Sequence, residues 1–303
     1  MLLSGAAYAV SLLPQLGAGA LLHPARHEMT AALPAACTSV RFAGHEVTLA
    51  GWACRASAAR RATLVYLHGI ADNRASSAGI IERFTARGFD VVAYDSRAHG
   101  QSGGAACTYG YLEKQDLRRV LDRVEPGPVV LVGTSLGAAV ALQSGAIDSR
   151  ITAIVAAETF SDLRTVANER APFFFSRSII ARAFDVAEEQ GRFRAADISP
   201  AEAAKQITVP VLLIHGAADI DTPPAHSQRV FDALRGPKRL ILVPGARHNE
   251  SLRGGEIWNT IESWIDAAVT ASDRRGRPVP SWQSSWPSAS DPAPRNDRRR
   301  RSP

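Results

Sequence analysis

The chain has 303 residues, of which 46% are hydrophobic and 21% charged. These proportions are those of a globular protein with one large or two small domains, and they exclude a collagen-like, a wholly disordered or a multi-span membrane protein. The net charge of +6 lies mostly in the last part of the chain, so it does not mark the remainder as a binder of anionic partners. The cysteines Cys37, Cys54 and Cys107 are too few and too scattered for a disulfide scaffold, and no CxxC pair indicates a zinc site.

The N-terminal segment, residues 1–25, is apolar. No charged side chain occurs from Met1 to Leu22, a length that suffices for one membrane span of about 20 residues. Three interpretations are open: a membrane anchor or uncleaved signal, a cleaved signal peptide, or an apolar arm packed on the folded domain. We favour the first, which predicts membrane contact through residues 1–22 and a membrane-anchored or exported protein; the alternative is a cytoplasmic one. In an oxidising compartment Cys54 and Cys107 would be able to form a disulfide.

An alternation of strands and helices begins after this segment. From about Val40 to Cys54 apolar and polar residues alternate around Gly44, which predicts an antiparallel hairpin. Short, nearly continuous apolar runs, typical of buried strands, follow at 62–67, 90–94, 129–132, 151–155, 209–214 and 239–243. Helices are expected between them near 76–87, 113–124, 136–145, 225–234 and 256–269. This order predicts an α/β fold with a mostly parallel central sheet and helices on both faces.

The regular spacing breaks once, between Glu158 and Ile207. We interpret this stretch, about 158–207, as an inserted helical cap, because a loop of that length without secondary structure is uncommon. Its phenylalanines would either line an apolar acyl pocket or pack the cap; they include Phe160, Phe173, Phe174, Phe175 and Phe184.

The folded domain is expected at 38–270, followed by a basic tail at 271–303. From Ser272 to Pro303 eight arginines outnumber three aspartates. The tail is rich in Pro, Ser and Arg and nearly lacks aliphatic residues, so it should stay unfolded. A solvated terminus is the simpler interpretation of such a charge run, and we expect no nucleic-acid partner.

A candidate nucleophile follows the run at 129–132. Gly133-Thr134-Ser135-Leu136-Gly137 fits the G-x-S-x-G elbow, with an apolar strand before it and an apolar helix after it. In such a turn the serine is held in a strained conformation, and side chains at the two glycine positions would collide with it or its neighbours. Ser135 would then project above the sheet.

A base and an acid are needed to activate a serine hydroxyl, and histidine is the base best matched to neutral pH. Of the eight histidines, His248 lies in the loop after the last strand, where it can reach across to Ser135. Asp219, after the preceding strand, is the carboxylate that would orient it, with Asp221 as a rival. Two backbone N–H groups are the expected oxyanion donors: that of Leu136, at the start of the helix after Ser135, and that of Ile70, in the loop after the first parallel strand.

Over about Val40 to Ala268 the chain resembles the α/β-hydrolase superfamily. The resemblance rests on motifs that follow the strands: His68-Gly69, DSRAHGQS at 95–102, GTSLG at 133–137, GAADIDTP at 216–223 and PGARH at 244–248. Among the branches of the superfamily it is most similar to bacterial serine hydrolases grouped with carboxylesterases, monoglyceride lipases and peptidase-like hydrolases. The family order of nucleophile, acid and base is that of Ser135, Asp219 and His248, and its spacing favours Asp219 over Asp221.

The resemblance implies a serine hydrolase that transfers an acyl group to water and needs no metal or organic cofactor. It also implies that Asp95 and His68 hold loops rather than react. We interpret the protein as an esterase for a short or medium acyl chain, with a small-molecule acyl substrate. The alternatives are an amidase, peptidase or thioesterase on the same residues, with Glu158 as the contact for a charged substrate terminus, and a non-catalytic binding protein.

Overall fold

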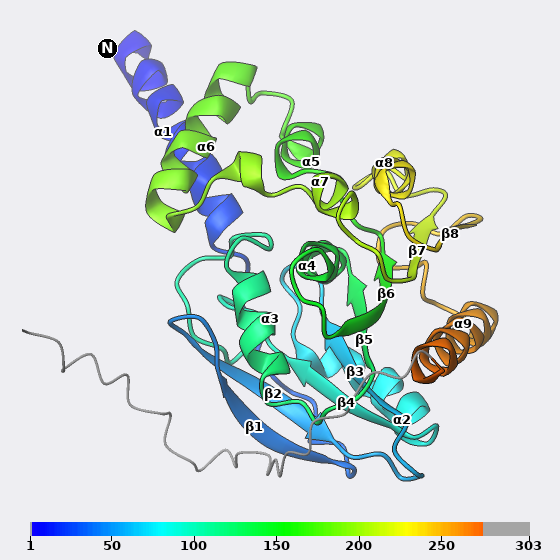
Figure 1. Ribbon diagram of the computed structural model, residues 1–303. Coiled ribbons are helices and arrows are strands. Elements are labelled where there is room, and N and C mark those ends of the chain that lie inside the picture. Colours follow the sequence, from blue (N-terminus) through cyan, green and yellow to red (C-terminus); the bar gives the residue numbers. More distant parts are fainter. Residues whose placement is uncertain (1, 275–303) are drawn as a thin grey trace, which may run out of the picture.

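The computed structural model describes residues 2–274, which contain one eight-stranded sheet (Figure 1). The strands are β1 (Cys37–Ala43), β2 (Thr48–Cys54), β3 (Ala62–Leu67), β4 (Phe89–Tyr94), β5 (Val129–Thr134), β6 (Ile151–Ala157), β7 (Val211–Gly216) and β8 (Lys238–Val243). Their order across the sheet is β1-β2-β4-β3-β5-β6-β7-β8. The hairpin β1-β2 joins β4 antiparallel, and β3 to β8 all run parallel, which confirms the predicted sheet.

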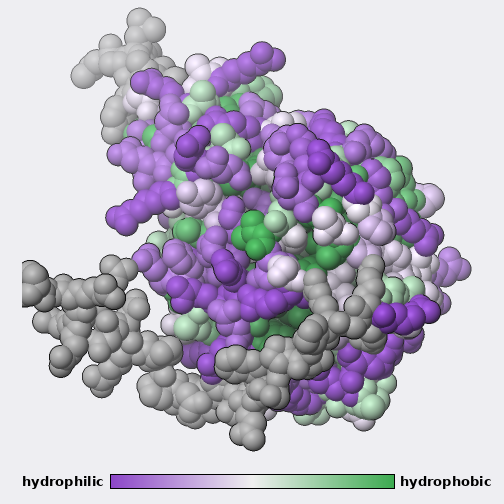
Figure 2. Space-filling model, viewed as in Figure 1, coloured by the Kyte–Doolittle hydropathy of each residue, from purple (hydrophilic) through white to green (hydrophobic). Residues whose placement is uncertain are grey.

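Two layers of helices bury the central strands of the sheet. The helices of the domain body are α2 (Ala78–Thr85), α3 (Glu113–Leu121), α4 (Leu136–Gly145), α8 (Ala225–Ala233) and α9 (Gly255–Asp273). Leu117 of α3 and Leu142 of α4 belong to the core on one face of the sheet, and Phe84 of α2 and Ile261 of α9 to the core on the other. Every residue of β3 and β4 is buried, because both faces are covered. On the side of the molecule in Figure 2 hydrophilic residues predominate and apolar ones gather in small groups.

The long stretch between β6 and β7 is helical, as predicted for a cap. It contains α5 (Leu163–Arg170), α6 (Arg177–Gly191), the short 3-10 helix η2 (Ala195–Asp197) and α7 (Pro200–Ala204). Asp162 and Ser176 are the N-caps of α5 and α6, and their side-chain oxygens accept the backbone N–H groups of Thr165 and Ile179. Since α7 packs on α4 and α8 of the body, α5 and α6 make up the part of the cap that stands above the sheet.

The N-terminal segment forms the helix α1 (Leu2–Leu22), which runs beside α6 (Figure 1). The two helices meet closely at Gly17, where an added Cβ would lie 2.9 Å from the Cβ of Ala183. The carbonyl of Leu22 accepts the backbone N–H of Cys107 at 2.8 Å. None of the helices in residues 2–274 has the length and apolar character needed to cross a membrane. Among the three interpretations of this segment, the contacts of α1 with α6 and with Cys107 fit the packed arm.

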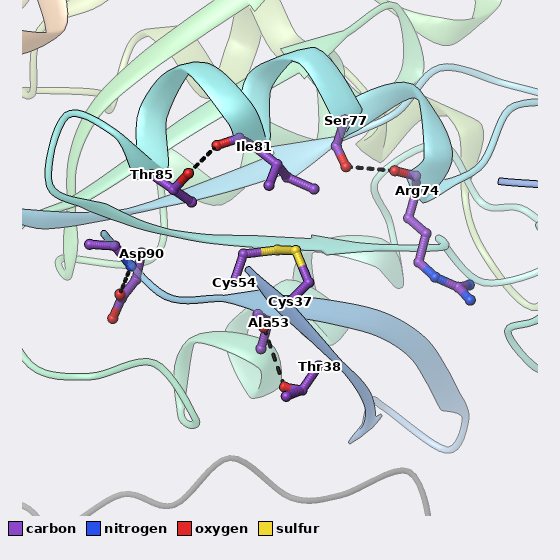
Figure 3. Close-up of a disulfide and its surroundings, with 10 residues drawn as sticks. Cys37, Thr38, Ala53, Cys54, Arg74, Ser77, Ile81, Thr85 and Asp90 are labelled. Carbon is purple, nitrogen blue, oxygen red and sulfur yellow. Dashed lines mark hydrogen bonds between the residues drawn. A yellow bond between two sulfur atoms is a disulfide. The ribbon is translucent and has the colours of Figure 1, made fainter. Parts of the chain in front are cut away.

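The predicted pairing of Cys54 with Cys107 is wrong. Cys54 is bonded to Cys37, because the register of the β1-β2 hairpin places these two residues directly opposite each other (Figure 3). Cys107 is a buried free thiol in the core on the opposite face of the sheet. At the other end of the chain, α9 continues to Asp273, so the first residues of the predicted tail are helical; residues 275–303 lie outside the described part.

Candidate active site

Three residues far apart in the sequence meet where β5, β7 and β8 end. The imidazole Nε2 of His248 lies 3.1 Å from the Oγ of Ser135, and its Nδ1 lies 2.7 Å from the Oδ2 of Asp219. Asp219 and Ser135 are 3% and 7% exposed, and His248 is partly buried, so most of the chain of hydrogen bonds is shielded from solvent. A serine, an imidazole and a carboxylate in this order can deliver an activated alkoxide.

The backbone of the turn between β5 and α4 holds Ser135 in place. Its φ of 48° and ψ of −111° are strained for a residue with a side chain, and its N–H is anchored to the carbonyl of Ala157 at 2.8 Å. The flanking glycines permit the turn: a Cβ on Gly137 would lie 2.0 Å from the carbonyl oxygen of Leu67, and one on Gly133 would lie 2.4 Å from the carbonyl oxygen of Gly137. The sharp turn therefore needs glycine at both positions, as the sequence predicted.

Asp219 is held as an anion. Its Oδ1 accepts the N–H groups of Asp221 and Thr222 at 3.0 and 2.9 Å, and its Oδ2 contacts His248 and, at 3.2 Å, the Nε2 of His215. Burial alone would raise the pKa of Asp219, but these hydrogen bonds outweigh it and hold the pKa well below the usual range. Asp221, the rival acid, is exposed and meets the site only through its backbone.

Two backbone N–H groups are placed to receive a developing oxyanion. Leu136 begins α4, and Ile70 follows Gly69, whose Cα lies so close to Ser135 that an added Cβ would sit 3.6 Å from the serine Cβ. Among the described residues, neither the N–H of Ile70 nor that of Leu136 has an acceptor. Ile70, Leu136 and Ser135 line one pocket, so both donors are available there.

A family model described as the alpha/beta hydrolase fold matches residues 62–196. The chain has the α/β-hydrolase fold. It is 28% identical to the uncharacterized protein YfhR of Escherichia coli (strain K12) over 88% of this chain and 92% of that protein.

Solved structures with the α/β-hydrolase fold include esterases and peptidases. The Pyrococcus furiosus esterase Pf2001 superposes with a TM-score of 0.65 at 20% identity, over 83% of this chain and 97% of that one. The Pyrococcus horikoshii acylaminoacyl peptidase superposes with a TM-score of 0.59 at 17% identity, over 77% of this chain and 41% of that one. At these identities the likeness concerns the fold.

Glu158 has a role that the sequence did not indicate. It follows β6 with a positive φ of 56° and is 2% exposed. Its carboxylate accepts the N–H of Asn249 at 2.5 Å and that of Ser251 at 2.9 Å, in the residues directly after His248. The interpretation of Glu158 as a contact for a charged substrate terminus is therefore wrong, because its oxygens are committed to the histidine loop. A lone acidic residue after a strand carries no sequence signal that separates these two roles.

Replacing Glu158 with glutamine should loosen the loop of His248. The amide NH2 would face backbone N–H donors, so we expect the free energy of unfolding to fall by about 1–3 kcal/mol. We also expect the rate at which a fluorophosphonate labels Ser135 to fall by roughly ten- to a hundredfold, because small displacements of a catalytic base are costly. Urea denaturation and timed labelling measure the two effects. The matched control is Glu256→Gln, an exposed glutamate at the start of α9; equal losses in both variants would contradict the assignment.

His68 and Asp95 hold the neighbouring loops, as expected. The Nε2 of His68 accepts the N–H of Ser96 at 2.9 Å, so its Nδ1 carries the proton that is donated to the carbonyl of Gly69 at 2.7 Å. The carboxylate of Asp95 accepts the backbone N–H and the guanidinium of Arg74. Both side chains are fully buried, and neither touches Ser135 or His248.

His99, packed edge-on against His68 with 5.1 Å between ring centroids, should make stability pH-dependent. Burial and the nearby His68 lower the pKa of His99 to about 4 from its ordinary 6.5. The folded protein then binds this proton less readily than the unfolded chain. The stability due to neutral His99 is present above about pH 6.5 and is lost as the pH falls towards 4. We expect a loss of up to about 3 kcal/mol in the free energy of unfolding, measured by urea denaturation at pH 7 and pH 4.5. The same pH dependence in His99→Phe would contradict this.

An apolar pocket of about 420 Å³ opens beside Ser135. Its walls come from the cap, from α1 and from Ile70 and Leu136, the two residues with the oxyanion donors. The cap contributes Phe160, Phe174, Phe175 and Phe184, and α1 contributes Leu13, Leu16, Gly17, Ala20 and Leu21. Phe173, which the sequence placed with this cluster, is instead fully exposed. Among residues 2–274 no group of three or more His, Cys, Asp or Glu side chains could hold a metal ion.

Proposed function

We propose that the protein hydrolyses carboxylic esters with a short or medium acyl chain, through an acyl-enzyme on Ser135. The observation that carries this proposal is the unbroken contact of Ser135, His248 and Asp219 beside an apolar pocket that Ser135 lines. A triad beside an apolar pocket suits a substrate with a hydrocarbon chain next to its carbonyl group.

The first half of the reaction acylates the serine. Ser135 Oγ attacks the ester carbonyl carbon while Nε2 of His248 takes the hydroxyl proton, and the carbonyl π electrons move to the oxygen. The N–H groups of Ile70 and Leu136 stabilise this oxyanion, and Asp219 stabilises the imidazolium. When the oxyanion collapses, the bond from carbon to the alcohol oxygen breaks, and His248 returns the proton to the leaving alcohol.

The second half repeats these steps with water. His248 takes a proton from a water molecule as the water oxygen attacks the acyl carbon. Collapse of the second oxyanion breaks the bond to Ser135 Oγ, which regains the proton from His248. The products are a carboxylic acid and an alcohol, and no redox partner is needed.

The acyl chain would lie between the cap and α1. The pocket has a volume near the low end of the range of about 300–1,000 Å³ for small-molecule sites. Because α1 forms one wall, the N-terminal helix takes part in the choice of acyl chain, and assays should use the full chain.

The test is hydrolysis of p-nitrophenyl esters from acetate to palmitate by the full-length protein. We expect the highest kcat/KM for a short or medium chain and loss of activity in Ser135→Ala. If no ester is hydrolysed although a fluorophosphonate labels Ser135, amides, peptides or thioesters become the candidate substrates. If Ser135 is not labelled, the protein is a non-catalytic binder.

A further inference from the structure

One positively charged side chain lines the active-site pocket. Among the described residues that line it, Arg170 is the charged one, and the others are apolar or neutral. Arg170 is the last residue of α5, and its guanidinium donates to residues of the loop that follows β7. A charged group at the mouth of an otherwise apolar pocket is a candidate for orienting a substrate.

The position of this guanidinium is set by the loop that carries Asp219. The Nε of Arg170 donates to the carbonyl of Asp221 at 2.7 Å, and its Nη2 donates to the Oγ1 of Thr222 at 2.7 Å. Thr222 is 2% exposed, and its own N–H is bonded to Asp219. These hydrogen bonds hold the guanidinium of the exposed Arg170 in a fixed position relative to Asp219.

Arg170 has no ion pair within the described part of the chain. Arg164, six residues earlier on the same helix, pairs with Glu188 at 2.6 Å, and Arg150 pairs with Asp122 and Asp148. Arg170 has neutral acceptors only, and Nη2 also lies 3.5 Å from the Nε2 of His248. A guanidinium with unused donors binds carboxylates and phosphates better than neutral oxygens.

The contact with His248 shows which part of the substrate would meet this charge. Nε2 of His248 passes its proton to the leaving oxygen, so a group 3.5 Å from Nε2 lies beside the leaving alcohol. We propose that Arg170 binds a carboxylate or phosphate on the leaving-group side, so that the preferred substrates are acyl esters of anionic alcohols. This inference rests on the proposed ester hydrolysis and names its substrate class.

The charges at the site also favour, during the reaction, a leaving alcohol that carries a carboxylate or phosphate. When His248 becomes an imidazolium, two positive charges stand side by side, which by itself opposes proton transfer. An anion on the substrate would accept from Arg170 and offset the repulsion. The effect should therefore reach kcat as well as KM.

The test compares three butyryl esters that differ in one substituent: those of ethylene glycol, glycolate and phosphorylated ethylene glycol. The ethylene glycol ester is the neutral reference, and the other two distinguish carboxylate from phosphate. The measured quantity is the ratio of kcat/KM for each anionic ester to that for the neutral one, in wild type, Arg170→Gln and Arg170→Lys. Arg182→Gln, which removes an exposed arginine of α6 that does not line the pocket, is the matched control.

We expect a ratio of about ten or more in wild type and in Arg182→Gln, the size typical of one charge-assisted contact. In Arg170→Gln it should fall to about one, and Arg170→Lys should restore part of it because the charge remains. A wild-type ratio near one with good turnover of the neutral ester, or an unchanged ratio in Arg170→Gln, would overturn the anion subsite and leave the esterase proposal standing. No hydrolysis of any of the three, together with inactivity on p-nitrophenyl esters, would overturn both.

Discussion

Alanine in place of Ser135 is expected to lower kcat/KM for p-nitrophenyl esters by roughly a thousandfold or more, because no other group can form the acyl-enzyme. The residual rate would come from the oxyanion donors and binding, which the substitution leaves in place. The serine is 7% exposed, and among the described residues its hydroxyl is hydrogen-bonded to His248, so the free energy of unfolding should change little, or rise as the strained turn relaxes. Steady-state kinetics and urea denaturation measure both.

The matched control for this variant is Ser144→Ala. Ser144 lies on α4, the helix that Ser135 precedes, and its buried hydroxyl has no hydrogen-bond partner among the described residues. Its removal should leave kcat/KM near the wild-type value. If Ser135→Ala kept more than about a tenth of the activity, against the losses usual for a nucleophile, hydrolysis would have to proceed without the acyl-enzyme.

Asparagine in place of Asp219 is expected to lower kcat by about ten-thousandfold. The amide can keep its oxygen toward the N–H groups of Asp221 and Thr222, and its NH2 then faces the Nδ1 of His248 and the Nε2 of His215. To accept from this NH2, His248 must release the Nδ1 proton and carry it on Nε2, where it can no longer take the proton of Ser135. Kinetics at pH 7 to 9 measure the loss.

The variant Asp221→Asn tests which of the two acids, Asp219 or Asp221, orients His248. It makes the same chemical change two residues away, on an exposed side chain, and should keep kcat within about twofold, as is usual for surface substitutions. Comparable losses in Asp219→Asn and Asp221→Asn would contradict the assignment of Asp219. A loss confined to Asp219→Asn, with an unchanged unfolding transition, would support its role in holding His248.

Much of the fold could be predicted from local patterns. The apolar run at 62–67 coincides with β3, because a central strand covered by helices on both faces is mostly apolar. The run at 239–243 lies within β8, an edge strand whose residues are exposed or partly buried, so there only the local pattern of Leu240 to Val243 indicated the strand. The run at 209–214 began two residues early, since β7 starts only after Pro210, which lacks a backbone donor.

The candidate site could be predicted because its residues follow strands of one parallel sheet. Ser135 comes directly after β5, Asp219 and His248 lie in the loops that follow β7 and β8, and parallel strands bring their carboxyl ends to one edge. The two glycines of the elbow could be predicted for a similar local reason, because the turn itself excludes a Cβ at both positions.

The sequence by itself thus determined the α/β order, the elbow and the residues of the candidate triad, because each depends on a repeat or turn of a few residues. Tertiary structure alone decided which cysteine Cys54 meets, whether Glu158 faces substrate or backbone, and where α1 packs. It also decided that Arg170 stands beside His248. Each of these is a pairing between segments distant in the chain, and a thiol, a carboxylate, an apolar helix or a guanidinium has the same local pattern whichever partner the fold brings to it.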